Sequence, residues 1–140
     1  MTALHQRGLL DTSTVIALQQ LVDPGAIPAQ PEISTMTLAE LSVGPLVAPT
    51  RKEQADRQAH LQRAEADFDP LPFDANAARA FGQVAASLRR AGRKSSARTF
   101  DAMIAAVAIS NELPLYTCNP ADFRGIDGLT VVVVPTPTVA

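Results

Sequence analysis

Four short stretches of the sequence each place an acidic or amide side chain beside an apolar run. They are L-L-D-T-S with Asp11, T-L-A-E-L with Glu40, F-D-A-M-I-A-A with Asp101, and T-C-N-P-A-D-F with Asn119 and Asp122. Oxygen ligands of this kind suit hard cations such as Mg²⁺ or Mn²⁺. Carboxylates that converge from separate elements repel one another, and a bound divalent ion removes that cost. One or two such ions could activate a water for displacement at phosphorus.

Each acid also has a purely local interpretation. Asp11 could favour the N-terminus of a helix that begins after it, and Asp101 stands in the first turn of a predicted helix, where a carboxylate suits the helix dipole. Glu40 comes three residues after Thr37, which is the spacing of a capping box. Asp122 could cap the segment after the Asn119-Pro120 turn. Taken one at a time, these residues leave the local and the chemical interpretations open.

The chain offers few residues for any other catalytic chemistry. It has one cysteine, Cys118, and two histidines, His5 and His60, so neither a thiolate cage nor an imidazole-rich zinc site is expected. The sequence has no Gly-rich phosphate loop of the Walker kind and no G-x-S-x-G elbow. Carboxylates, amides and hydroxyls remain as the candidate functional groups.

Length and composition predict one compact domain. The chain has 140 residues, 46% of them hydrophobic, and a net charge of −2, which gives no global attraction to nucleic acid or anionic membrane. Its longest apolar stretches, 102–109 and 129–135, are far shorter than the roughly 20 residues of a membrane span. No secretory pattern is present at the N-terminus, so we expect a cytoplasmic location. We expect a domain at 9–136 between short tails at 1–8 and 137–140.

Strands alternate with helices along the chain, which predicts an α/β fold with a mainly parallel sheet. The predicted strands are 8–10, 32–34, 113–117 and 130–134, with an edge strand at 71–73. The last two full strands read as continuous apolar runs, typical of strands buried on both faces. The predicted helices are 13–21, 37–43, 50–67, 74–90 and 100–111.

In such sheets, ligands bind beyond the carboxyl ends of the strands. The strand that ends at Leu10 runs into Asp11, and the strand that ends at Thr117 runs into Asn119 and Asp122. Parallel strands end at the same edge of a sheet. These polar groups are therefore expected to share one site.

At these residues the sequence resembles the PIN-domain ribonucleases, and in particular the VapC toxins of bacterial type II toxin–antitoxin pairs. The stretches L-L-D-T-S-T-V-I, T-L-A-E-L, F-D-A-M-I-A-A-V-A and T-C-N-P-A-D-F carry the likeness, which extends from Leu9 to about Val134. It implies a three-layer domain whose sheet is flanked by helices. It also implies a hydrolase, a metal-dependent endoribonuclease that forms a homodimer and is inhibited by a VapB-like antitoxin.

The resemblance assigns roles to the polar residues of the four stretches. Three acids match ligands of Mg²⁺ or Mn²⁺: Asp11, Glu40 and Asp101. Three further residues match groups that orient waters and ligands around the metal: Ser13, Asn119 and Asp122. Some family members carry an Asp where Asn119 stands, so either Asn119 or Asp122 fills the fourth catalytic position.

Basic residues are concentrated in the segment that ends three residues before Asp101. They are Arg89, Arg90, Arg93, Lys94 and Arg98. We predict that they contact RNA phosphates, a sequence-independent and salt-sensitive interaction. The alternative is that they are the usual cations at a helix C-terminus and in the solvated loop after it.

The sequence is compatible with two other functions. The chain could be a PIN-like binding module that has lost catalysis, and the neutral Asn119 gives this alternative some weight. It could also be a housekeeping PIN nuclease outside any toxin pair. Binding of Mn²⁺ separates the first alternative from an active nuclease.

Overall fold

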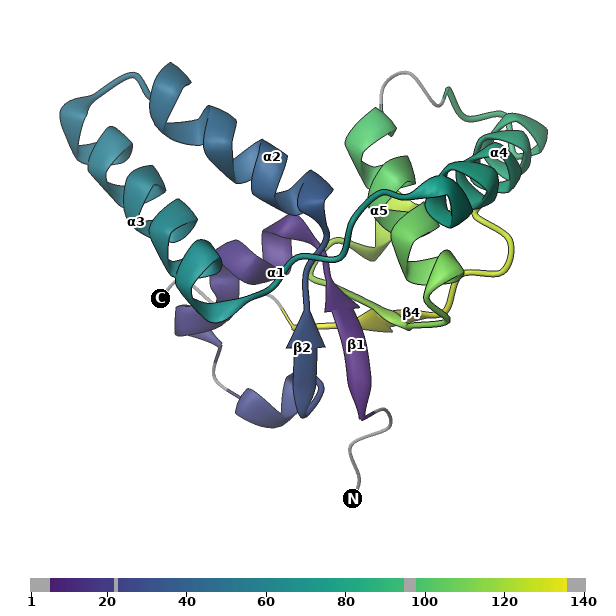
Figure 1. The fold of residues 1–140 in the computed structure, drawn as a ribbon, viewed down its shortest axis with the longest axis horizontal. Helices are drawn as coiled ribbons and strands as arrows, with labels where there is room; N and C mark the ends of the chain where they lie inside the picture. Colours follow the sequence, from purple (N-terminus) through teal and green to yellow (C-terminus); the bar gives the residue numbers. More distant parts are fainter. Residues whose placement is uncertain (1–5, 22, 95–97, 136–140) are drawn as a thin grey trace.

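The protein has a four-stranded parallel sheet (Figure 1). The computed structural model describes residues 6–21, 23–94 and 98–135. The strands are β1 (Arg7–Leu10), β2 (Gln30–Glu32), β3 (Leu115–Thr117) and β4 (Val131–Val133). They lie in the order β2-β1-β3-β4, and every neighbouring pair is parallel. The predicted α/β class with a mainly parallel sheet is confirmed.

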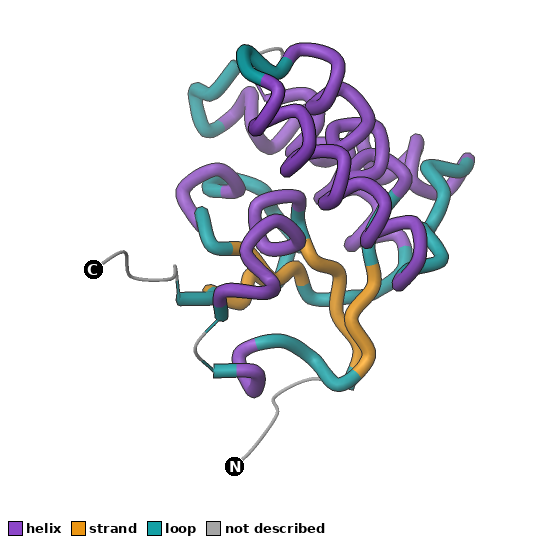
Figure 2. Tube along the Cα trace, turned by 90° about the vertical axis from the view of Figure 1, so that its left-hand side faces the viewer, coloured by secondary structure: helices purple, strands orange, loops and turns teal. Residues whose placement is uncertain are grey.

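Five α-helices connect and cover the strands. They are α1 (Thr12–Ala17), α2 (Thr35–Val43), α3 (Arg51–Asp67), α4 (Ala75–Arg90) and α5 (Thr99–Ser110). Figure 1 shows α2 and α3 as one helical hairpin and α4 and α5 as a second group, and Figure 2 shows the strands gathered beneath the larger helices. No helix of the described residues is both long and apolar enough to cross a membrane.

The hydrophobic core has two parts, one on each face of the sheet. Successive residues of a strand point to opposite faces, so Leu9 and Leu10 enter different parts. Leu9 packs in a cluster with α4 and α5, whereas Leu10 packs in a cluster that includes residues of α1, α2 and α3. Helix α5 is buried along most of its length, as its apolar sequence predicts. This confirms the three-layer arrangement.

The N-terminus of α2 differs from the prediction. Strand β2 covers 30–32 instead of 32–34, because Ser34 leaves the sheet and becomes the N-cap of α2. The Ser34 hydroxyl accepts a hydrogen bond from the Thr37 amide at 3.2 Å. Helix α2 therefore begins at Thr35, two residues before the predicted start, and the alternative interpretation of Thr37 and Glu40 as a capping box is wrong.

Two predicted strands are weaker than expected. The edge strand predicted at 71–73 is reduced to a single bridge between Ser34 and Leu71. The prediction that the last strand is buried on both faces is also wrong, because β4 is an edge strand and Val133 is 57% exposed. Proline on both sides of Leu71 removes two backbone donors and explains the first difference.

The ends of the chain are described only in part. Strand β1 begins at Arg7, within the stretch predicted as the N-terminal tail. The Arg7 guanidinium donates to the Glu32 carboxylate at 2.7 Å and links β1 to β2. Residues 1–5 of the predicted N-terminal tail and all of the predicted C-terminal tail, 137–140, lie outside the described residues.

Candidate active site

Asp11 lies at the carboxyl edge of the sheet, directly after β1. Its amide donates to the Tyr116 carbonyl at 3.1 Å, so the β1–β3 pairing continues to this residue. Asp11 is the N-cap of α1, and it is only 4% exposed. A buried carboxylate at this position needs several hydrogen-bond donors.

Hydroxyl groups supply most of these donors. Thr117 donates to one Asp11 oxygen at 2.6 Å, Thr14 donates to the other at 2.8 Å, and Ser13 lies within 3.0 Å of both. The Thr14 amide completes the set at 3.0 Å. Asp11 thus caps α1 and is also held in a fixed position, so the local and chemical interpretations are compatible. Sequence reasoning identified Ser13 but missed Thr14 and Thr117.

Glu40 reaches the same edge from α2. The Thr12 hydroxyl lies 2.6 Å from a Glu40 carboxylate oxygen and 3.0 Å from the Thr37 hydroxyl. Burial raises the pKa of Glu40, the Thr12 hydrogen bond partly opposes this, and the charge of Asp11 raises it further. Thr12, which the sequence analysis missed, therefore connects the segment after β1 with the second acid.

Asp101 is the most strongly perturbed acid of the cluster. Its pKa is raised from 3.8 to about 6, first by burial and then by the charges of three other carboxylates: Asp122, Glu40 and Asp11. The Arg98 guanidinium acts in the opposite direction. Because the charges of Asp122, Glu40 and Asp11 all act on Asp101, acids from four separate segments lie near one another.

Asn119 and Asp122 differ in their relation to this cluster. Asn119 is exposed, and its backbone N–H donates to the Thr117 hydroxyl at 2.9 Å, which helps to hold the hydroxyl that contacts Asp11. Asp122 lies in the short 3₁₀ helix Pro120–Phe123 and raises the pKa of Asp101. Of the two candidates for the fourth position, Asp122 thus supplies negative charge to the cluster.

Three of the predicted RNA-binding arginines have partners within the chain. Arg90 pairs with Asp127 at 3.1 Å, and Arg93 donates to two backbone carbonyls, those of Ala121 and Arg124. Arg98 lies within the acidic cluster, where its Nη1 is 2.6 Å from an Asp122 oxygen. Arg93 and Arg98 therefore tie the basic segment to the loop that carries Asp122.

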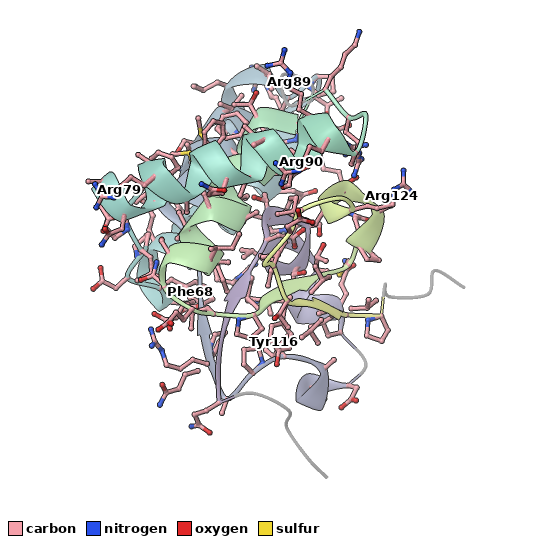
Figure 3. All side chains as sticks on the ribbon, turned by 90° about the vertical axis from the view of Figure 1, so that its right-hand side faces the viewer. Phe68, Arg79, Arg89, Arg90, Tyr116 and Arg124 are labelled. Carbon is pink, nitrogen blue, oxygen red and sulfur yellow. The ribbon has the colours of Figure 1, made fainter. Side chains whose placement is uncertain are left out.

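Arg89 and Lys94 are exposed, and no ion pair joins either of them to another residue in the described part of the chain. Figure 3 shows Arg90 and Arg124 toward one end of α4 and Arg79 toward the other. Exposed basic residues therefore lie toward the Arg90 end of α4: Arg89, Lys94 and Arg124.

The donors of the cluster suit a hard divalent ion. In residues 6–21, 23–94 and 98–135, no three acidic, histidine or cysteine side chains form a ready-made metal cage. Mg²⁺ does not require one, because it keeps several waters and is commonly held by one or two carboxylates. One buried and several half-buried carboxylates that repel one another, flanked by hydroxyls, meet this requirement. The fold and the site define an α/β domain with an acidic, cation-attracting centre at the carboxyl edge of its sheet.

Comparisons with known proteins agree with this description. Residues 9–129 match the family described as PIN domain. Ribonuclease VapC5 of Mycobacterium tuberculosis is 39% identical over 94% of this chain and 96% of its own length. Ribonuclease VapC8 of the same species is 35% identical over 72% of this chain and 89% of its own. The chain therefore belongs to the PIN-domain family, in its VapC ribonuclease branch, as the resemblance of the four stretches implied.

Solved structures show the same fold. A chain of VapBC-5 from Mycobacterium tuberculosis, a member of the VapBC toxin–antitoxin systems, superimposes with a TM-score of 0.80 and 39% identity, covering 93% of this chain and all of its own. A chain of DNA-bound VapBC from Salmonella typhimurium gives 0.68 at 25% identity, covering 91% of this chain and 97% of its own.

Proposed function

We propose that this protein is the endoribonuclease toxin of a toxin–antitoxin pair, which hydrolyses RNA phosphodiester bonds in the cytoplasm with the help of Mg²⁺ or Mn²⁺. The observation that carries the proposal is that acids from separate segments meet at the carboxyl edge of the sheet: the Thr12 hydroxyl, next to Asp11, lies 2.6 Å from Glu40, and Arg98 contacts both Asp101 and Asp122. Burial, and then the charges of the neighbouring acids, raise the pKa of Asp101 to about 6. Such repulsion is unfavourable unless a cation offsets it. The ribonuclease names of the related chains support the same conclusion.

Asp11, Glu40 and Asp101 would hold the ion, directly or through water. When bound, the ion supplies a Lewis acid that polarises a phosphoryl oxygen and lowers the pKa of water. The residues around the acids orient them: Ser13 and Thr117 fix both oxygens of Asp11, and Thr12 fixes Glu40. Asn119 and Asp122 would complete the site by orienting waters and neighbouring ligands.

The basic segment would bind the RNA backbone beside these acids. Arg89 and Lys94 are exposed at the end of α4 and after it, where they can contact phosphates. Arg93 holds the neighbouring loop through the Ala121 and Arg124 carbonyls, and Arg90 pairs with Asp127 only at the surface, where a phosphate can replace the carboxylate. The contacts are expected to be insensitive to sequence and sensitive to salt.

An antitoxin would cover the groove that leads to Glu40. This cavity of about 340 Å³ lies between α1, α2 and α3. Its lining includes Thr12, Ile16, Glu40, Leu41, Arg57 and His60. Ile16 is 45% exposed, so the groove offers an apolar contact within reach of the second acid. The solved toxin–antitoxin complexes of the same fold support an antitoxin partner, and the homodimer stays a prediction.

Mapping of new 5′ ends in total RNA after brief expression tests this proposal. The parent chain should arrest growth and produce discrete new 5′ ends, whereas Asp101→Ala should produce neither. Equal cleavage by the two proteins would contradict the site. Cleavage without growth arrest would favour a housekeeping nuclease, and a chain that neither cuts RNA nor binds Mn²⁺ would be a binding module.

A further inference from the structure

Arg98 places a positive charge inside the acidic cluster. It is the N-cap residue of α5, and its Nη1 lies 2.6 Å from an Asp122 oxygen and 3.8 Å from an Asp101 oxygen. The side chain is 37% exposed. Both contacts use Nη1, and Nε and Nη2 make no hydrogen bond to another residue in the described ranges. The guanidinium therefore has donors left for a ligand.

The fourth position of the cluster differs in charge from the other three. Asn119 is neutral, and the Asp122 carboxylate is already paired with Arg98. Asp11, Glu40 and Asp101 have no comparably close cation among the described residues, since the only salt bridge to any of them is the 3.8 Å contact of Asp101. A second divalent ion beside Asp122 would either displace the Arg98 guanidinium or bind more weakly because of the repulsion between the two cations.

We propose that Arg98 takes the place of a second metal ion in this site. The cluster binds one divalent ion through Asp11, Glu40 and Asp101, directly or through water, and Arg98 binds the phosphate group of the RNA on the Asp122 side. Asp122 then acts as a positioning residue that aims the guanidinium. This inference rests on the proposed function, because it assigns the charges of that same site.

The chemistry of the guanidinium suits this role. Two-metal nucleases clamp the attacking and leaving oxygens between two cations, and arginine stabilises charge on a transferring phosphoryl group in the same way. Its planar array of donors matches phosphate geometry in a bidentate contact. The exposed side of Arg98 leaves such donors accessible. The guanidinium itself cannot bind a metal ion, because metal ligands are anions or neutral oxygen or nitrogen atoms.

Calorimetric titration with Mn²⁺, combined with single-turnover cleavage of a defined RNA, tests the proposal. The parent should bind one Mn²⁺ per chain. Arg98→Gln should bind Mn²⁺ more tightly, by roughly tenfold, or take up a second ion, because a competing cation is gone. The same variant should cleave at least tenfold more slowly, since the phosphate loses its clamp. Arg98→Lys, which keeps the charge, should bind one ion and cleave at an intermediate rate.

Arg79→Gln is the matched control, because it removes an exposed arginine toward the opposite end of α4 from Arg90 (Figure 3). It should leave Mn²⁺ stoichiometry, affinity and cleavage unchanged. Two Mn²⁺ per parent chain would overturn the proposal, and so would an Arg98→Gln variant with unchanged or weaker Mn²⁺ binding. If Arg98→Gln does not fold, the Mn²⁺ stoichiometry of the parent and the stoichiometry and cleavage rate of Arg98→Lys still test the proposal. A parent that binds no Mn²⁺ would contradict the proposed function itself.

Discussion

At the scale of single residues, threonine and serine hydroxyls determine where the acids of the site lie. Asp11 accepts from Ser13, Thr14 and Thr117, and Glu40 lies against Thr12. Outer partners of this kind orient a metal ligand before the ion arrives, and their loss typically weakens metal binding by about 10–100-fold. The hydroxyls are therefore part of the site although none of them carries charge.

Thr12→Val should release Glu40 from its fixed position. The substitution keeps the shape of the side chain but removes the hydroxyl that lies 2.6 Å from the Glu40 carboxylate. We expect Mn²⁺ binding, measured by calorimetry, to weaken by roughly tenfold. Ser42→Ala is the matched control, because among the described residues that hydroxyl donates to the Leu38 carbonyl of its own helix and to no acid. Equal affinities for the parent and Thr12→Val would show that the hydroxyl does not position Glu40.

Asp101→Asn should stabilise the metal-free protein at neutral pH. The pKa of Asp101 in the folded chain, about 6, lies above its ordinary value of 3.8, so the folded state binds the extra proton between these two values. The stability of the parent therefore falls as the pH rises through this range and stays lower above it. Removal of the charge should raise the free energy of unfolding at pH 7.5 by about 1–2 kcal/mol.

Denaturation in EDTA at pH 4 and pH 7.5 measures this effect. The difference in the free energy of unfolding between Asp101→Asn and the parent should be present at pH 7.5. It should be nearly absent at pH 4, where the Asp101 carboxyl of the parent is protonated and therefore neutral like asparagine. Asp69→Asn, at an exposed position outside the cluster, should show no such difference at either pH. A variant less stable than the parent at pH 7.5 would contradict the repulsion that we describe.

At the scale of secondary-structure elements, the long helices and the parallel sheet were predictable from local patterns. Helices α3 and α4 begin after Thr50 and Asp74, whose side chains accept hydrogen bonds from the amide three residues further on. Such caps are visible in the sequence. The start of α2 was missed because Ser34 and Thr37 are both plausible caps, and only the pairing of β2 with β1 decides between them.

The charged residues of the site could be predicted from the sequence, but the contacts that position them could not. Acids after apolar runs, such as Asp11 and Asp101, mark the ends of elements in the sequence itself. Thr117 contacts Asp11 across 106 residues of chain, and no local pattern connects these two positions. The contact of Arg98 with Asp122 likewise depends on how α5 and the loop after β3 pack together.

Alanine in place of two glycines tests how closely each is packed: Gly8 in β1 and Gly82 in α4. A Cβ on Gly8 in β1 would lie 2.5 Å from the Tyr116 ring and 3.1 Å from Pro28, so Gly8→Ala should destabilise the protein by about 1–3 kcal/mol. Gly82, inside α4, has nothing within 4 Å of that position, so Gly82→Ala should stabilise it by about 0.5–1 kcal/mol. Chemical denaturation of both variants measures the two signs. A stable Gly8→Ala protein would contradict the close approach of β1 to Tyr116.

At the scale of the whole molecule, the acidic cluster joins segments from both groups of helices. Asp11 lies directly after β1, Glu40 comes from the α2–α3 hairpin, and Asp101 comes from α5 (Figure 1). An ion held by all three would connect the two parts of the core, which lie on opposite faces of the sheet. A ligand that binds only the folded state adds to its stability.

Mn²⁺ should therefore raise the melting temperature of the parent. At a concentration of 100 times its dissociation constant, the ion adds about 2.7 kcal/mol to the free energy of unfolding. Differential scanning calorimetry should show this shift for the parent, its reversal by EDTA, and little shift for Asp101→Asn. A melting temperature that is independent of Mn²⁺ would mean that the acids do not share an ion.

Cleavage of RNA by the purified protein tests the central claim most directly. We predict that the parent cuts RNA with Mn²⁺ or Mg²⁺, that EDTA stops the reaction, and that Asp101→Asn remains inactive at the same metal concentration although it is folded. If Asp101→Asn cut RNA at the parent rate, the reaction would not depend on the carboxylates at the edge of the sheet.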